Sequence, residues 1–277
     1  MVFCIGAMCF YLVVPQRLES LPKVPFEGAM NGWSGYSPEH AGWRFVKSLY
    51  DTYQNEASVS DKYIIPKLIH LIWLGSPLPA RCQAMVISWE KFHPGWTVKV
   101  WRDDDADSFH FINQAAFSRA QNYGEKSDIW RYEILYQYGG LYIDTDFECL
   151  QPFDELHRSC EFYTGLGQAI NPDVWIGLIG SIPGHPILRA TIDHLKPGPG
   201  DQNIDRIMNE TGAYLFSKVF LEIAPTCRPT SVVALPITFF YPMHAGERFR
   251  TDRWNIKPEC VKPESMAIHY FDTSWQK

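Results

Sequence analysis

Short apolar runs alternate along the chain with longer segments in which apolar side chains recur every three or four residues. The first pattern is typical of buried strands, and the second of helices that cover them. Strands are predicted at residues 68–73, 96–101, 141–143, 162–166 and 232–240, with a further apolar stretch at 171–182. Helices are predicted at residues 41–56, 82–93, 128–138, 187–195 and 214–223, with others between residues 102 and 121 and from residue 202. Because strands and helices alternate, we expect right-handed crossovers and an α/β fold with a mostly parallel sheet.

The most informative stretch is residues 125–153. Ser127 is predicted to cap a helix that runs to Tyr138, because a hydroxyl can accept a hydrogen bond from the first turn. The two glycines at residues 139–140 are expected to end this helix. The apolar residues 141–143 then predict a short buried strand, so the stretch reads as helix, turn and strand in close succession.

Two aspartates, Asp144 and Asp146, follow that strand directly. Residues two apart in an extended chain point to the same side, and ligands of open α/β sheets collect beyond the carboxyl ends of strands. Carboxylate oxygens suit a Mg²⁺ or Mn²⁺ ion that holds a diphosphate. The alternative is a polar turn, but the helix and strand ahead of the pair favour a metal site. The acidic run at residues 103–107 lacks that frame and is interpreted as the solvated start of a helix.

The composition indicates one large α/β domain, or such a domain with a small appendage. The 277 residues are 46% hydrophobic and 15% aromatic, with ten Trp, which supports a substantial core and fits stacking on sugar or base rings. The net charge of −6 argues against a nucleic acid as partner. The seven Cys show neither a Cys-x-x-Cys pair nor zinc spacing, and they leave open whether one disulfide forms.

Several short elements together resemble the family 32 glycosyltransferases. They are Ser127-Asp128, Arg131, Gly139-Gly140-Leu141-Tyr142 and Asp144-Thr145-Asp146, within a broader match over residues 64–275 that is strong at 64–73 and 125–153. The family includes the yeast initiating α-1,6-mannosyltransferase and the α-1,4-galactosyl- and N-acetylglucosaminyltransferases, and the clostridial glucosylating toxins share a similar core. The resemblance implies a GT-A-type nucleotide-diphospho-sugar transferase fold, with a mostly parallel central sheet flanked by helices.

The resemblance also implies roles for the residues of this pattern. Asp144 and Asp146 would hold Mn²⁺ or Mg²⁺ with His269 as a further ligand, and an imidazole ligand favours Mn²⁺. Arg131 would join Asp144 and Asp146 in catalysis, either by orienting Asp144 or by contacting the donor sugar. A purely structural pair of Arg131 with Asp128 is the alternative, because residues three apart share a helix face.

The same resemblance implies a set of donor-binding residues: Trp73, Asp128, Arg131, Asp144, Ser274 and Trp275. Trp73 would be the platform for the nucleotide base, although an ordinary tryptophan at a strand end is the alternative. Ser274 and Trp275 would close over the diphosphate. Residues 210–212 resemble a further element of the family, Thr-Gly-Pro, but Ala213 replaces the proline and weakens any role assigned there.

The chain is expected to divide into residues 1–14, 15–60 and 61–277. Residues 1–14 are apolar but shorter than the roughly 20 residues of a spanning helix, so they could anchor the protein, target it or pack against it. We favour a membrane-associated, Golgi-type location if the source is eukaryotic, with a soluble cytoplasmic location as the alternative. Residues 15–60 are interpreted as an irregular stem and a helical lead-in, and residues 61–277 as the catalytic domain.

These features, taken with the resemblance, predict a metal-dependent, retaining hexosyltransferase. It would move a hexose from GDP-mannose or a UDP-hexose to a glycan, glycolipid or protein acceptor. Retention would come from front-face attack with the departing phosphate as base, so no separate carboxylate nucleophile is expected. Two alternatives stay open, namely a nucleotide-sugar-binding protein without activity and a metal-dependent phosphoester hydrolase, although the hydrolase would need more metal ligands.

Overall fold

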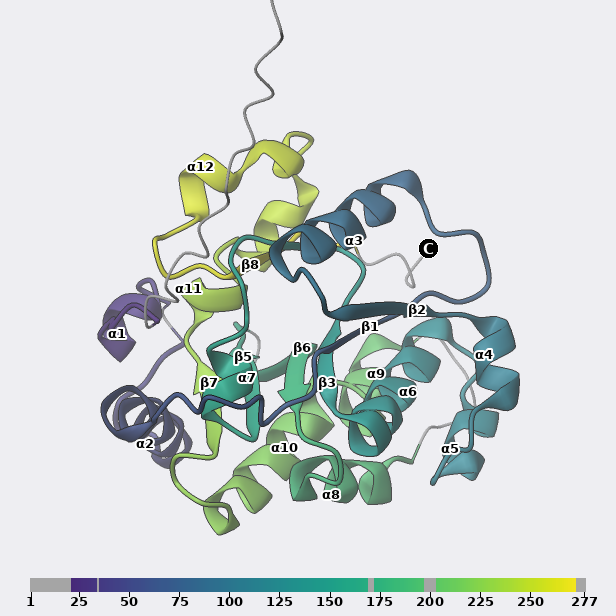
Figure 1. Ribbon diagram of the computed structural model, residues 1–277, viewed down its shortest axis with the longest axis horizontal. Coiled ribbons are helices and arrows are strands. Elements are labelled where there is room, and N and C mark those ends of the chain that lie inside the picture. The colour runs from purple at the N-terminus through teal and green to yellow at the C-terminus, as the bar shows by residue number, and fades with distance from the viewer. Residues whose placement is uncertain (1–20, 34, 169–171, 197–202, 273–277) are drawn as a thin grey trace, which may run out of the picture.

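The computed structural model describes residues 21–33, 35–168, 172–196 and 203–272. Within these residues, a six-stranded sheet has the order β2-β1-β3-β6-β5-β7 (Figure 1). Its strands are β1 (Leu68–Ile72), β2 (Thr97–Trp101), β3 (Gly140–Ile143), β5 (Phe162–Leu166), β6 (Val174–Ser181) and β7 (Val232–Leu235). β6 pairs antiparallel with β3 and β5, and the remaining pairs are parallel. The expected α/β class with a mostly parallel sheet is therefore confirmed.

Helices flank this sheet on both faces (Figure 1). The longer helices are α2 (Ala41–Glu56), α3 (Ala80–Phe92), α6 (Tyr123–Tyr138), α8 (Pro186–His194), α9 (Ile204–Glu210) and α10 (Ala213–Ile223). The shorter helices are α1 (Phe26–Ala29), α4 (Asp103–Ser108), α5 (Gln114–Arg119), α7 (Leu156–Ser159), α11 (Ile237–Phe240) and α12 (Lys257–Cys260), with 3₁₀ turns η1 (Ala224–Thr226), η2 (Ala245–Phe249) and η3 (Arg253–Asn255). A second sheet pairs β4 (Phe147–Cys149) with β8 (Ala267–His269).

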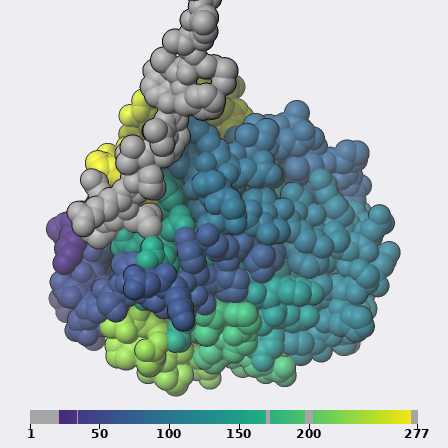
Figure 2. Space-filling model, viewed as in Figure 1, coloured from purple at the N-terminus to yellow at the C-terminus, as the bar shows by residue number. Residues whose placement is uncertain are grey.

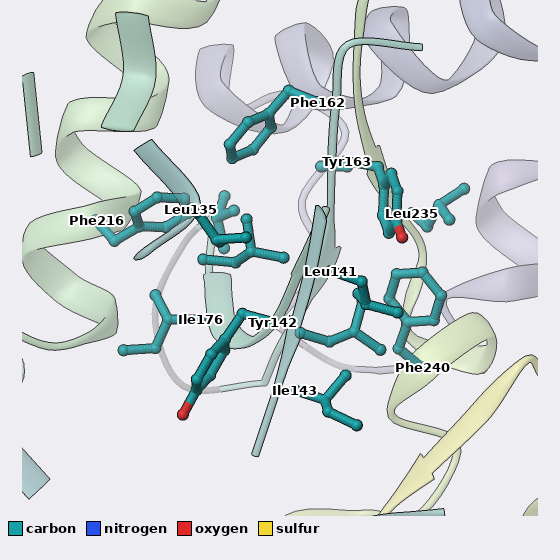
Figure 3. Packing of buried hydrophobic residues seen from close by; sticks show 14 of the residues in the cluster. Leu135, Leu141, Tyr142, Ile143, Phe162, Tyr163, Ile176, Phe216, Leu235 and Phe240 are labelled. Carbon is teal, nitrogen blue, oxygen red and sulfur yellow. The ribbon is translucent and has the colours of Figure 1, made fainter. Parts of the chain in front are cut away.

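Strand β3 is buried on both faces, as its apolar sequence predicts. Figure 3 shows Leu141 and Ile143 on the side of Tyr163 and Phe240, while Tyr142 points to the opposite side. Successive side chains of a strand alternate in this way because the backbone is pleated. Packing of these apolar side chains fixes the orientation of β3. The same orientation sets the side to which the polar residues after β3 point.

Helix α6 begins earlier than the sequence indicates. Its N-cap is Asn122, whose side chain accepts a hydrogen bond from the N–H of Gly124. The predicted cap at Ser127 is therefore wrong, and Ser127 lies inside the helix. Asn and Ser are comparable caps in isolation, so the packing around Asn122 decides between them. The predicted end of the helix is confirmed, because Gly139 is its C-cap with a φ of 64°.

Two further boundaries differ from the predicted ones. The strand expected at residues 232–240 ends at Leu235, because Pro236 has no N–H for the ladder and begins α11 instead. β7 is an edge strand of the sheet. The single helix expected between residues 102 and 121 is two short helices, since Phe109 and Phe111 leave the helical path and pack with ring centroids 5.7 and 5.9 Å from Trp130.

The lead-in before the sheet is packed against the rest of the protein. Phe26 of α1 is buried, and Tyr50 of α2 lies with its ring centroid 6.0 Å from that of Phe239. Figure 2 shows the dark-blue residues of this segment directly against the light-green residues of the C-terminal half. Part of the stem expected at residues 15–42 is therefore helical and buried, while the division of the chain at residue 60 stays a prediction.

The apolar residues 1–14 lie outside the described residues, as do Ser274 and Trp275. No helix that the structure describes has the length and apolar character needed to cross a bilayer. The five cysteines within the described ranges, Cys82, Cys149, Cys160, Cys227 and Cys260, are free thiols. The question of one disulfide is therefore answered for these five.

Candidate active site

A cavity of about 510 Å³ opens beyond the carboxyl ends of β1 and β3. Trp73 lines it from the end of β1, Arg131 from α6, and Asp144 and Asp146 from the turn after β3. His269 lines it from the end of β8. Parallel strands present their carboxyl ends at one edge of a sheet, which is why residues distant in sequence meet here.

Arg131 is the centre of a buried charge network. Its Nη1 donates to Asp144 Oδ1 at 2.9 Å and to the carbonyl of Ile176 at 3.0 Å, and its Nη2 donates to Asp128 Oδ1 at 2.8 Å. The guanidinium lies 4.5 Å from the ring centroid of Tyr142, whose hydroxyl also donates to Asp144 Oδ1 at 2.9 Å. Arg131 therefore does both things that the sequence left as alternatives, since it pairs with Asp128 and orients Asp144.

Burial shapes the electrostatics of this network. It raises the pKa of Asp128 to about 7, although the charge of Arg131 acts in the opposite direction. Burial would also lower the pKa of Arg131, but the nearby Asp144 outweighs it and the pKa is raised, so the guanidinium stays charged. Thr211 supports the second oxygen of Asp128 by donating to Oδ2 at 3.2 Å. Thr211 thus positions Asp128 even though Ala213 departs from the family pattern.

The pairing of β4 with β8 brings His269 to the aspartates. Phe147 and His269 are register partners, and their rings stack with centroids 4.4 Å apart. His269 Nε2 lies 3.0 Å from Asp146 Oδ1. One ligand atom from each of Asp144, Asp146 and His269 lies within 4.8 Å of the others.

These three side chains fit a divalent ion. Two carboxylate oxygens and one imidazole nitrogen form a donor set suited to Mn²⁺. His269 Nδ1 is also buried without a hydrogen-bond partner within the described residues, so the ring has no competing polar contact at that atom.

A backbone turn after β8 holds Asp146 in place. The N–H of Asp272 donates to Asp146 Oδ2 at 2.7 Å. Phe271, which precedes Asp272 in the chain, makes this turn with a φ of 51°. Burial would raise the pKa of Asp146, but His269 and this N–H outweigh burial and lower it. The carboxylate of Asp272 is bound by Arg81 and, at 2.8 Å, by Arg253. This clasp of Arg81, Asp272 and Arg253 has no motif in the sequence, because its members are joined only by folding.

Trp73 lies on the loop after β1 and lines the same cavity. Its Nε1 donates to Ser76 Oγ at 3.1 Å, and its side chain stays partly exposed. Gly75 in the same loop has a φ of 77°, and a Cβ there would lie 2.4 Å from the Tyr123 ring. The N–H of Gly75 donates to Asp103 at 2.9 Å, so the acidic run serves as a structural anchor.

Two further histidines, His70 and His185, have structural partners. His70 Nε2 lies 2.9 Å from the carbonyl of Gly139, and the Trp101 Nε1–H donates to His70 Nδ1 at 3.2 Å. His185 caps α8 by accepting from the N–H of Ile187. Both residues lie in the scaffold rather than on the cavity wall.

Part of this site matches a known protein family. Residues 79–163 match the model described as a glycosyltransferase sugar-binding region containing a DXD motif. The family resemblance stated from the sequence is therefore confirmed, and the matched residues include Asp128, Arg131, Asp144 and Asp146, whereas His269 lies outside them.

Two fungal proteins are similar to this glycosyltransferase-like chain. Inositol phosphoceramide mannosyltransferase 1 of Schizosaccharomyces pombe is 31% identical over 167 residues, which cover 57% of this chain and 51% of that protein. Mannosyl phosphorylinositol ceramide synthase CSH1 of Saccharomyces cerevisiae is 30% identical over 167 residues, covering 58% of this chain and 44% of that protein. The chain spans about half the length of these curated relatives.

A solved structure, PaToxG glycosyltransferase, is also similar to this chain. It has 17% sequence identity and a TM-score of 0.47, covering 73% of this chain and 79% of that one. This likeness is too distant to bear on substrate or mechanism.

Proposed function

We propose that this chain is a metal-dependent, retaining mannosyltransferase that uses a nucleotide-diphosphate sugar. The observation that carries the proposal is the convergence of Asp144, Asp146 and His269 within 4.8 Å, in a cavity lined partly by the segment that matches a sugar-binding region. A divalent ion held there would neutralise the leaving diphosphate as a Lewis acid. The residues of the chain would bind and orient the donor.

The charge network orients the donor side of the site. Arg131 fixes Asp144 through one nitrogen and Asp128 through another, so both carboxylates are held before a donor arrives. Because these groups are already oriented, less free energy is needed to reorganise them as charge develops in the transition state. Asp128 and Trp73 face the same cavity and are our candidates for holding the nucleoside, with Trp73 offering a partly exposed ring to the base.

The carboxylates of the cavity support retention without a covalent intermediate. Four described carboxylates line it, and each is engaged: Asp128 and Asp144 by Arg131, Asp146 by His269, and Asp272 by two arginines. A nucleophile on the opposite side of the sugar would need an unengaged carboxylate. Front-face attack, in which the departing phosphate takes the acceptor proton, needs no carboxylate nucleophile.

The names of the relatives suggest the substrates. Both similar fungal proteins are named for transfer of mannose to inositol phosphoceramide or for its mannosylated product. We therefore propose a mannose donor, GDP-mannose before a UDP-hexose, and a glycolipid acceptor with an inositol phosphate headgroup. The lipid acceptor also suits membrane association, for which residues 1–14 are the candidate segment.

The test is nucleotide binding with and without Mn²⁺ in an Asp146→Ala variant. We expect GDP to raise the unfolding temperature of the wild type in the presence of Mn²⁺, since a ligand at a hundredfold excess over Kd adds about 2.7 kcal/mol. Asp146→Ala should lose this shift. Asp104→Ala, in the exposed acidic run, is the matched control and should keep it. Equal Mn²⁺-dependent shifts in both variants would overturn the metal assignment.

Acceptor-dependent product separates transfer from the two alternatives. A binding protein without activity would shift in temperature with GDP and Mn²⁺ but release no mannosylated lipid. A hydrolase would release sugar or phosphate at a rate that the lipid acceptor does not change. The described residues provide three ligands for one ion rather than the larger set of a two-metal hydrolase, which favours transfer.

A further inference from the structure

Arg248 lies on the wall of the same cavity, at a position that no sequence motif marks. It belongs to the 3₁₀ turn η2 and lines the cavity together with Asp146, His269 and Asp272. Its side chain is half-buried. The residue therefore reaches the site from a segment between β7 and β8, separate from the region matched by the glycosyltransferase model.

The surroundings of Arg248 differ from those of the neighbouring arginines. Arg250 is bound by Glu247, Asp252 and Glu259, and Arg253 is bound by Asp272. Among the described residues, the Arg248 side chain forms no ion pair, and its guanidinium carbon lies 4.6 Å from the centroid of the Phe249 ring.

The carboxylates of Asp272 and Asp146 on the cavity wall form no ion pair with this arginine, because each is bound by other groups. Asp272 already binds the guanidinium groups of Arg81 and Arg253, one on each oxygen. Asp146 is likewise engaged by His269 and by a backbone N–H. The N–H donors of the Arg248 guanidinium are therefore available to a ligand in the cavity.

The chemistry of the side chain limits what that ligand can be. A guanidinium group presents a planar fork of N–H donors that matches the oxygens of a phosphate or carboxylate. A divalent ion at Asp144, Asp146 and His269 would attract phosphate oxygens to the same cavity. Phosphate satisfies both requirements at once, because it carries several oxygens and a high charge.

We propose that Arg248 is a phosphate-binding residue of this cavity. The inference rests on the proposed function, since that function brings two phosphate sources to the site. One is the diphosphate of the nucleotide donor, and the other is the phosphate of a lipid headgroup acceptor. Phe249, which is 78% exposed, supports the guanidinium through a cation–π contact at 4.6 Å, while Arg248 itself lines the cavity.

The first measurement is calorimetric binding of pyrophosphate in the presence of Mn²⁺. Arg248→Gln should weaken binding about tenfold or more, because a hydrogen bond to a charged group is lost. Arg248→Lys keeps the charge without the fork and should fall between the wild type and the glutamine variant. Arg189→Gln is the matched control, since Arg189 lies exposed on α8, away from the cavity wall, and forms an ion pair with Asp193.

The second measurement is flotation with phosphatidylcholine vesicles, with and without phosphatidylinositol. Weaker pyrophosphate binding by Arg248→Gln assigns the residue to the donor diphosphate. Unchanged pyrophosphate binding with loss of phosphatidylinositol-dependent flotation assigns it to the lipid headgroup. Unchanged results in both measurements, or a wild type that binds neither probe, would overturn the inference.

Turnover separates this inference from the proposed function. If Arg248→Gln transfers mannose with unchanged KM for donor and lipid, the function stands and the inference fails. If the wild type binds pyrophosphate through Arg248 but transfers no sugar to any lipid, the inference stands and the function fails.

Discussion

Acidification is expected to destabilise this fold through His70. The ring sits in β1 and joins two other parts of the sheet, since Nε2 lies 2.9 Å from the Gly139 carbonyl and Nδ1 accepts from Trp101 Nε1–H. Only a neutral ring with its proton on Nε2 satisfies both partners. Protonation would set a second N–H of His70 against the N–H of Trp101, so the folded protein holds this ring neutral.

The size of the effect follows from the pKa of His70. Burial lowers this pKa from 6.5 to about 4, despite the opposing hydrogen bond to Gly139. Between these values the unfolded chain binds a proton that the folded chain rejects, so stability is full above pH 6.5 and is lost as the pH falls. From pH 7 to pH 5 the loss is about 2 kcal/mol for a histidine with these values.

The assay is urea unfolding at pH 7 and pH 5 for the wild type and His70→Gln. Glutamine keeps an amide donor near the Gly139 carbonyl but does not titrate. Burial also lowers the pKa of His157 to about 3 and of His185 to about 4, so both proteins should lose stability at pH 5. The wild type should lose about 2 kcal/mol more. Equal losses in the two proteins would refute the assignment of a neutral, buried His70.

Two substitutions test the geometry around the aspartates. Gly177→Ala should raise the donor KM severalfold, because the new Cβ would lie 2.9 Å from Asp144 Oδ2, whereas Gly28→Ala meets no atom within 4 Å and should leave KM unchanged. A Gly177→Ala enzyme with wild-type KM would contradict that close contact. Asp272→Asn should weaken Mn²⁺ binding about 10- to 100-fold. The substitution weakens the ion pairs with Arg81 and Arg253, which fix the position of the Asp272 N–H that donates to Asp146. Calorimetry with Mn²⁺ measures this, and unchanged affinity would remove Asp272 from the support of the site.

The sequence located the local elements of the site well. The helix ending at Gly139, the strand at residues 141–143 and the aspartates after it were all readable, because each depends on neighbours within a few residues. The start of α6 was misplaced, since Asn122 and Ser127 are both competent caps and only packing selects one. The break between α4 and α5 was missed for a similar reason, because it depends on the packing of Phe109 and Phe111 against Trp130.

The partners that complete the site could be suggested from sequence only where a known pattern existed. His269 was proposed through a family resemblance, and its approach to Asp146 depends on the pairing of β4 with β8 across 123 residues. Asp272 and Arg248 had no such pattern. Their roles arise from contacts between segments that are far apart in the chain, and no spacing within one segment records such contacts.

The amino-acid sequence by itself determined the order of helices and strands, the α/β class and the carboxylate pair at the end of β3. These properties follow from hydrophobic periodicity and turn residues, which act over short distances along the chain. Tertiary structure alone decided that Arg131 binds Asp128 and Asp144 together, and that Asp272 holds Asp146 while two arginines hold Asp272. The physical reason is that burial and charge pairing depend on three-dimensional neighbours, and folding brings those neighbours together only after the local elements have formed their sheet.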